Sequence, residues 1–187
     1  MLERKKKSEQ KEPARDRILR CAIARFSTQS YESTGLRMIA KDAGVDVAWV
    51  HRSFGSKEKL FAECVRVAIS ANEVLLASDG DRFNRLFEQV VRNREPGELR
   101  PIDIFIRSLS SSEASTAIRD IAQSLVMPSF VETEGHEARV ALVLSMLFGF
   151  SILRDVVGID ALTKAEPDDI KRLLIAASQA MNPGPTA

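Results

Sequence analysis

Apolar residues recur every three or four positions along most of the chain, which is the spacing of an α-helix with one buried face. The repeat is clear between positions 14 and 28, where it is carried by Ile18, Leu19, Ala22, Ile23 and Phe26. No stretch alternates apolar and polar residues with the period of a β-strand, and no segment is repeated. The sequence therefore predicts an all-α protein of about nine helices.

The segment from Thr34 to Lys59 predicts three consecutive helices joined by tight turns. In the first, Thr34 is the N-cap and apolar residues stand at positions i, i+3, i+4 and i+7, namely Leu36, Ile39, Ala40 and Ala43. Gly44 follows where a left-handed C-cap favours glycine. Asp46 and Ser56 have the side chains expected of N-caps for the next two helices.

The middle helix of the three, residues 47–54, combines a short apolar face with an unusual outer face. Val45, Val50 and Phe54 are predicted to point inward. The outer face presents Ala48, Trp49, His51 and Arg52, a composition suited to insertion into the major groove of DNA. The alternative for Trp49 is burial in a core, which is the usual fate of a large aromatic side chain.

The remaining pattern predicts further helices and their boundaries. A fourth helix runs from Ser56 to about Leu76, and breaks follow at Asp79–Asp81 and Pro96–Gly97. Later signals are a Ser110–Glu113 capping box, a kink at Pro128, an apolar helix over 137–157 and a last helix capped by Glu166–Pro167. The predicted organisation is a tail (1–12), a helix-turn-helix domain (13–60), a ligand-binding and dimerisation domain (61–182) and a second tail (183–187).

Charge is distributed unevenly along the chain. Residues 1–60 contain 14 Lys and Arg against 8 Asp and Glu, whereas residues 61–187 contain 13 against 18. A basic N-terminal region on an acidic remainder indicates that the N-terminal region meets a polyanion. The basic cluster Arg4–Lys7 could enter a DNA minor groove as an arm, although such a run is more often a solvated tail.

Several function classes are disfavoured by the sequence. Cys21 and Cys64 form neither a disulfide framework nor a metal site, and reduced thiols fit a cytoplasmic protein. The apolar run from Val140 to Leu153 has 14 residues, short of the ~20 that a membrane span requires, so a buried helix and no membrane contact are expected. We expect no enzyme, metal site or cofactor, since the sequence contains no catalytic or phosphate-loop motif and the aspartates at 79, 81, 168 and 169 and His136 are explained by turns and caps.

Residues 14–65 resemble the DNA-binding domain of the TetR family of transcriptional regulators. The shared residues, in order, are Phe26, Ser30-Tyr31, Thr34, Ile39-Ala40, Ala43-Gly44-Val45, Phe54 and Ser56-Lys57-Glu58-Lys59-Leu60. The chain departs from the family pattern at Ser30, at Gly35, and at His51 and Ser53, which replace two tyrosines of the recognition helix. Trp49 replaces a small polar residue.

The resemblance implies a homodimeric, ligand-responsive regulator, most simply a repressor that binds double-stranded DNA in the cytoplasm. The resemblance implies a phosphate contact at His51, where the family commonly has a tyrosine. Thr34, Arg37 and Lys57 stand at helix N-termini or in first turns, where backbone N–H groups and side chains can hold phosphates. Trp49 and Arg52, with Val47 and Ala48, are expected to read bases, and a backbone contact is an equal alternative for Arg52. The last two long helices are expected to form the dimer interface. A small-molecule effector is expected in a pocket of the C-terminal domain, for which Phe83, Phe87 and Phe105 are candidate lining residues. Two alternatives are a DNA-binding scaffold controlled by a protein partner and, least favoured, a ligand carrier or enzyme with a vestigial DNA-binding domain.

Overall fold

The computed structural model describes residues 12–72, 74, 82–95, 97–98, 100–130 and 137–181, and these residues form helices and no strand. The predicted Arg4–Lys7 arm, the Asp79–Asp81 turn, His136 and the tail 183–187 lie outside the described residues. The N-terminal helices are α1 (Ala14–Thr28), α2 (Leu36–Ala43), α3 (Val47–Phe54) and α4 (Lys57–Ser70). They are followed by α6 (Arg82–Val91), α7 (Pro101–Ser108), α8 (Ser112–Ile121), η1 (Ala122–Val126), α9 (Met127–Phe130), α10 (Glu137–Ser151), η2 (Ile152–Val157), α11 (Asp160–Thr163) and α12 (Pro167–Ala180).

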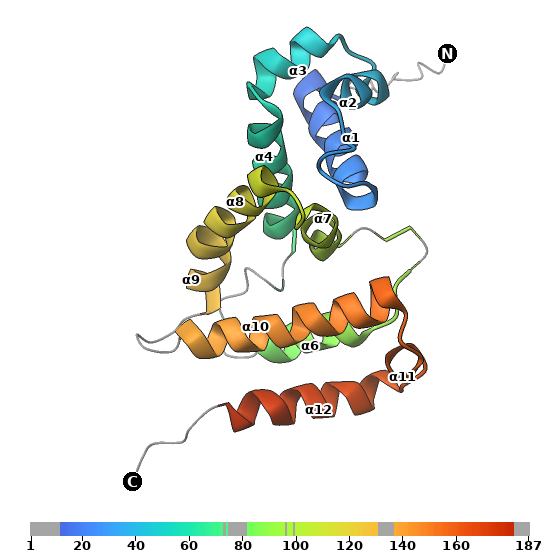
Figure 1. Ribbon diagram of the computed structural model, residues 1–187, viewed down its shortest axis with the longest axis vertical. Coiled ribbons are helices and arrows are strands. Elements are labelled where there is room, and N and C mark those ends of the chain that lie inside the picture. The colour runs from blue at the N-terminus through green and yellow to red at the C-terminus, as the bar shows by residue number, and fades with distance from the viewer. Residues whose placement is uncertain are drawn as a thin grey trace, which may run out of the picture.

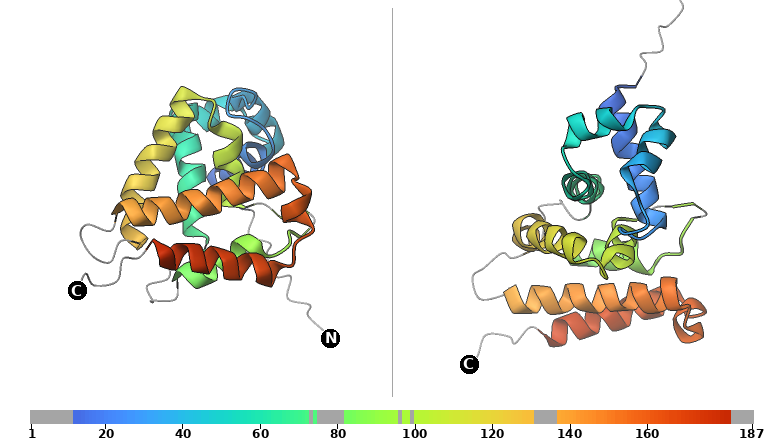
Figure 2. Two further views of the ribbon diagram at one scale, coloured as in Figure 1. Left: turned by 60° about the horizontal axis from the view of Figure 1, so that its bottom comes forward. Right: turned by 45° about the horizontal axis from the view of Figure 1, so that its top comes forward.

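The helices are arranged along one long axis of the molecule (Figure 1). α1, α2 and α3 lie at one end, and α6, α10 and α12 form a layer at the other end. α4, α7 and α8 lie between them, and the two further views show the same order (Figure 2). α3 and α12 are therefore at opposite ends of the protomer.

A first core fills the N-terminal end, and its centre is a group of three aromatic rings. The Phe61 ring packs edge-on against Phe26 and Tyr31, with ring centroids 5.0 and 5.1 Å apart. Phe26 and Phe61 have no exposed surface. This core continues through α4 to Ile118 and Ile121 of α8, so apolar packing crosses the domain boundary predicted at residues 60 and 61.

A second core joins α6, α9, α10 and α12. Its buried members are Leu86, Phe87, Val91, Phe130, Val140, Val143, Leu147, Phe150 and Leu174. α10 and η2 together form a helix of 21 residues, which by length and composition alone could cross a membrane. The length of the apolar run therefore decides little, and the packing of one face of this helix in the second core is the better support for the predicted buried helix.

Most of the predicted helix ends are confirmed. Gly44 is left-handed with φ 63°, the Asp46 carboxylate accepts a hydrogen bond from the Ala48 N–H at 2.7 Å, and Ser56 accepts from the Lys59 N–H at 3.2 Å. Glu166 is the N-cap of α12, with Pro167 in its first turn.

Two predicted caps are wrong by one residue. The N-cap of α2 is Gly35, because the Thr34 hydroxyl donates instead to the Ser30 carbonyl oxygen at 2.9 Å. The N-cap of α8 is Ser111 in place of Ser110, and its hydroxyl accepts from the Ala114 N–H at 3.3 Å. In both cases an adjacent residue occupies the geometry that the cap requires.

Two helices of the C-terminal region differ in detail from the expectation. α4 ends at Ser70 and does not continue to about Leu76. The predicted disturbance at Pro128 takes the form of a π-helical segment, η1, immediately before α9. Pro128 has no N–H to donate to the carbonyl four residues earlier, so the helix changes its hydrogen-bond register there.

Candidate functional site

The outer surface of α3 is the first candidate site. α2 and α3 are joined by the turn Gly44–Asp46, in which the Val45 N–H donates to the Ala40 carbonyl oxygen at 3.0 Å. Val50 and Phe54 are buried in the first core, while Val47 packs partly against it. One face of α3 is thus fixed to the protein, and the opposite face is left for contact with a partner.

Trp49 and Arg52 lie together on this outer face. The Trp49 side chain is 48% exposed, so the alternative of a core tryptophan is wrong. The Arg52 guanidinium carbon lies 4.9 Å from the centroid of the Trp49 ring, a cation–π distance. Ala48 and His51 are also exposed, and the His51 Nδ1 atom is 3.3 Å from the Gly55 carbonyl oxygen. The structure therefore brings the four predicted outer residues to one surface.

The predicted phosphate contacts are placed less uniformly. Arg37 is exposed in the first turn of α2, as a contact to an extended partner requires. Thr34 is completely buried and its hydroxyl is already donated to Ser30, so the prediction of a phosphate contact by this side chain is wrong. Lys57 is half-buried, and its ammonium lies 4.0 Å from the centroid of the Tyr31 ring.

Burial shapes the titration of this Tyr31–Lys57 pair. Burial raises the pKa of Tyr31 to about 12, and the nearby carboxylates of Glu58, Glu113 and Glu32 add to the effect. Burial lowers the pKa of Lys57, against the opposing effect of the same three carboxylates. The ring of Tyr31 is packed in the first core, so this pair links the start of α4 to the centre of that core.

Arginines of α1 hold α2 and α3 in place, and sequence reasoning missed them. The Arg17 Nε atom donates to the Ala43 carbonyl oxygen at 3.2 Å, at the C-terminus of α2. Arg25 forms a two-pronged ion pair with Asp42, and Arg15 lies over the Phe54 ring at 4.8 Å. These partners are far apart in sequence, so no local motif marks them.

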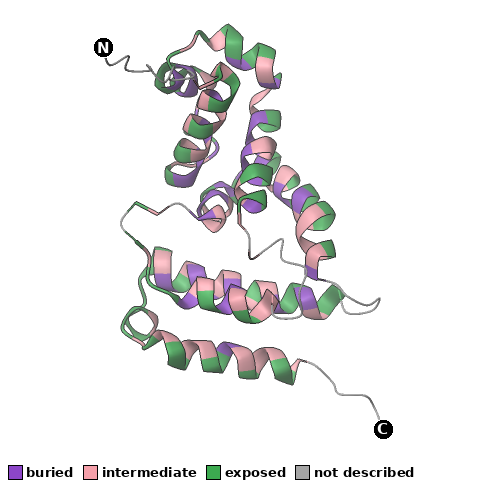
Figure 3. Cartoon of the chain, turned by 180° about the vertical axis from the view of Figure 1, so that it is seen from behind, coloured by how far each residue is buried: buried purple, intermediate pink, exposed green. Residues whose placement is uncertain are grey.

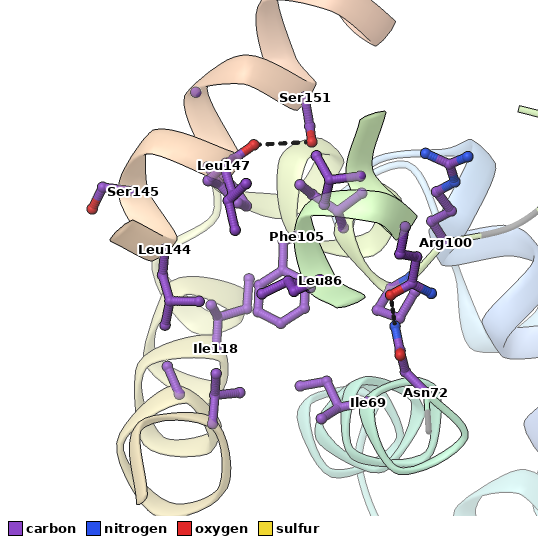
Figure 4. Close-up of a pocket in the computed structure, with 18 of the residues that line it drawn as sticks. Ile69, Asn72, Leu86, Arg100, Phe105, Ile118, Leu144, Ser145, Leu147 and Ser151 are labelled. Atoms are coloured by element: carbon purple, nitrogen blue, oxygen red, sulfur yellow. Dashed lines mark hydrogen bonds between the residues drawn. The ribbon is translucent and has the colours of Figure 1, made fainter. Parts of the chain in front are cut away.

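A cavity of about 500 Å³ between the two cores is the second candidate site (Figure 4). Residues of α4, α6, α7, α8 and α10 line it, and most are apolar, including Ile69, Leu86, Phe105, Ile118, Leu144 and Leu147. The amide nitrogen of Asn72 donates to the Gln89 side-chain oxygen at 3.1 Å in its wall. Such a cavity can hold a small molecule.

Only one of the three phenylalanines predicted to line a pocket does so. Phe105 lines the cavity. Phe87 is 1% exposed inside the second core, and Phe83 packs against that core with its ring centroid 5.0 Å from that of Phe130. The prediction of Phe83 and Phe87 as lining residues is therefore wrong, because α6 presents Leu86, Gln89 and Val90 to the cavity instead.

Two family models together match most of the chain. The model for bacterial regulatory proteins of the tetR family matches residues 18–64, which contain α2, α3 and the start of α4. The model for the tetracyclin repressor-like C-terminal domain matches residues 83–181, more than half of the chain. This chain belongs to the TetR family. TetR-family regulators are non-enzymatic DNA-binding proteins that repress transcription, often in response to ligands and typically as dimers.

Solved structures of other proteins share the fold over nearly the whole length. A regulator from Streptomyces coelicolor is 23% identical, with 90% of this chain and 93% of that chain covered and a TM-score of 0.58. NalD, the secondary repressor of the MexAB-OprM multidrug efflux pump in Pseudomonas aeruginosa, is 19% identical, with 90% and 96% covered and a TM-score of 0.59. The multidrug-binding protein EbrR, complexed with proflavin, is 13% identical, with 88% and 99% covered and a TM-score of 0.54. Comparison with curated proteins gave no match.

Proposed function

We propose that this TetR-family chain is a cytoplasmic, homodimeric and non-catalytic repressor that releases its DNA operator when a small molecule binds. The observation that carries the proposal is the exposed pair of Trp49 and Arg52 on α3, a helix whose other face is fixed in the first core. A short helix presented in this way has the size and polarity to enter a major groove.

In this proposal the residues divide between reading bases and holding phosphates. Arg52 reads a guanine edge, and Trp49 contacts a thymine methyl group, with Ala48 and the half-buried Val47 beside them. Arg37 and His51 contact phosphates. Lys57, whose ammonium group lies against the Tyr31 ring, also contacts a phosphate. α2 begins without a side-chain cap, so its first backbone N–H groups can also face a phosphate.

The proposed dimer uses the face of α10, η2 and α12 that the protomer leaves uncovered. Large apolar side chains there remain exposed, with Leu142 at 58% and Leu173 at 67%. α12 is coloured mainly as exposed and intermediate in Figure 3. Two copies joined through this face place two α3 helices on one duplex, and such pairs read half-sites about 34–36 Å apart.

The cavity supports a small-molecule effector in preference to a protein partner. It lies between the two cores and is lined by α4, the helix that leads directly from α3. A ligand that fits the cavity better in one arrangement of these helices shifts the population toward that arrangement, by no more than its difference in affinity. Among the structural relatives, NalD is a repressor and EbrR is a multidrug-binding protein with proflavin bound, which supports the same choice.

The direct test uses Trp49, which is the sole tryptophan. Duplex DNA from the region upstream of the coding gene is titrated into the protein while tryptophan fluorescence is recorded. We expect a saturable change that disappears at high salt, because phosphate contacts release counterions. Absence of a response, together with no salt-sensitive binding in a selection from random DNA, contradicts the proposal.

The role of Arg52 is tested by Arg52→Ala. If Arg52 reads a base, specific binding weakens by about 1–3 kcal/mol and selectivity at one base pair is relaxed. Arg119→Ala, which removes an exposed arginine of α8, is the matched control and should leave operator binding unchanged. Equal weakening of Arg52→Ala on all sequences assigns this side chain to a phosphate.

A further inference from the structure

The charged side chain that lines the cavity between the two cores forms its ion pair and hydrogen bonds outside the cavity. Arg100 is the charged residue among the described residues that line the cavity. Its guanidinium points away from Phe105 and Leu86 (Figure 4), and donates to Glu98 at 3.0 Å and to the carbonyl oxygen of Arg92 at 3.3 Å. Arg100 therefore contributes its hydrocarbon stem to the cavity, and its charge is already paired.

The hydroxyl groups of the lining are also satisfied by the protein. Ser145 donates to the Ala141 carbonyl oxygen at 2.7 Å, and Ser151 donates to the Leu147 carbonyl oxygen at 3.0 Å. The polar group that remains is the side-chain amide pair. Asn72 donates to Gln89 and accepts from the Val74 N–H at 3.1 Å, so both of its ends are used. The Gln89 amide nitrogen has no hydrogen-bond partner among the described residues.

An ionised group placed among the apolar side chains of this lining would lose its hydration without gaining an opposite charge. Burial of an unpaired charge is strongly unfavourable, whereas burial of an apolar body is favourable at about 25 cal/mol per Å². The lining thus selects by exclusion of charge as well as by apolar contact.

From this arrangement we infer that the effector is an uncharged, mainly apolar molecule. The inference rests on the proposed function, since it names the ligand class of the proposed effector site. No carboxylate lines the described part of this cavity, so the lining also offers no partner for an organic cation.

The test compares three ligands that share one alkyl chain and differ in charge. The full-length protein, without DNA, is saturated with the neutral fluorescent probe N-phenylnaphthylamine, and the probe is displaced by octanol, octanoate or octyltrimethylammonium. We expect octanol to displace the probe at a concentration about tenfold or more below that of either ion. Equal or better displacement by an ion, or no saturable binding of the probe, overturns the inference.

A pair of variants ties the result to the cavity. Gln89→Glu keeps an acceptor for Asn72 but adds a negative charge to the wall, so octyltrimethylammonium should gain on octanol by about tenfold. Gln123→Glu adds the same charge to an exposed position of η1 outside the lining, and the ranking of the three ligands should stay that of the unchanged protein. The same shift in both variants overturns the inference.

Operator binding of each preparation is measured separately by its salt dependence. Intact, salt-sensitive DNA binding alongside a failed ligand ranking overturns the ligand class alone. Loss of both overturns the proposed repressor as well.

Discussion

The two ends of the molecule bury their apolar side chains to different degrees. At the α1–α3 end, the aromatic group of Phe26, Tyr31 and Phe61 is at most 3% exposed, and the outer face of α3 carries His51 and Arg52 beside Ala48 and Trp49. At the α10–α12 end, the second core is buried on one side only, and Leu142 and Leu173 are more than half exposed on the other.

The contrast shows that a single protomer fixes the position of α3 but leaves an apolar face of α10 and α12 uncovered. The fixed position of α3 follows from packing and arginine contacts within a single chain. The uncovered face of α10 and α12 has no such partner among the described residues, and exposed apolar surface of this kind is typical of an interaction site. The shape of the proposed DNA-reading surface is thus a property of the protomer, while the spacing of two such surfaces depends on pairing.

The largest expected effect comes from breaking the first core. Phe61→Ala removes a ring with no exposed surface that contacts both Phe26 and Tyr31. We expect the free energy of unfolding to fall by about 3–5 kcal/mol, from lost burial and the cavity left behind. Urea denaturation followed by circular dichroism measures it.

The control for that change lies in the second core. Phe83→Ala removes a ring of the same size from a half-buried position, so the loss should be clearly smaller. A loss as large as that of Phe61→Ala would mean that the two cores are equally closed and that the two ends do not differ in burial.

A charge placed on the uncovered face should separate the proposed dimer. Leu142→Asp puts a carboxylate at a position that is 58% exposed in the protomer, so folding is preserved while a desolvated charge opposes association. We expect the dimer dissociation constant to rise by about 100-fold, as sedimentation equilibrium can measure. Met38→Asp, on α2 at the opposite end, should leave association unchanged. A dimer unaffected by Leu142→Asp would place the interface elsewhere.

The α2–α3 region could be predicted closely from sequence because its signals are local. Gly44 and Asp46 act on backbone groups within a few residues of themselves, so their types are enough to predict the turn and the cap. Thr34 shows the limit of this reasoning. Its hydroxyl could cap α2 or satisfy the Ser30 carbonyl, and only the path of the preceding turn decides between them.

The C-terminal region could be predicted only in outline, because its decisive contacts are distant in sequence. Phe87 and Phe105 both stand at helical spacing among aliphatic residues, and the rotation of α6 and α7 decides which one reaches the cavity. The buried contact from the Arg154 Nη1 atom to the Val91 carbonyl oxygen spans 63 positions. The apolar pattern of residues 140–153 predicted the helix and its apolar faces, but not which face the protomer would cover.

At low pH, protonation of Glu98, which lies just before α7, should lower the free energy of unfolding. Burial opposes the ionisation of Glu98, but hydrogen bonds from Arg100 and Arg92 outweigh it and lower its pKa to about 2. Its contribution to stability is present above its ordinary pKa near 4.5 and is lost as the pH falls toward 2. Glu98→Gln should therefore be less stable at neutral pH and lose less stability over that range. Glu137→Gln, at the exposed start of α10, is the control and should follow the unchanged protein in denaturation measured at several pH values.

At high pH, ionisation of Tyr31 in the first core should lower the free energy of unfolding, and this is the smallest of the expected effects. Burial raises the pKa of Tyr31 to about 12 from an ordinary value of 10.0. Between these values the unfolded chain releases the phenolic proton and the folded chain retains it, so stability falls as the pH rises; below pH 10 the group contributes no pH dependence.

Tyr31→Phe keeps the ring beneath Lys57 and removes the titrating hydroxyl, so its unfolding free energy should fall less steeply above pH 10. Cys64, whose pKa burial also raises, is present in both proteins and cancels in their difference. Tyr31 is the sole tyrosine, so the ultraviolet absorbance of tyrosinate reports its ionisation directly in the folded protein. Titration of this absorbance near pH 10 would show that the ring lies in water and that the first core is open at the α1–α3 end.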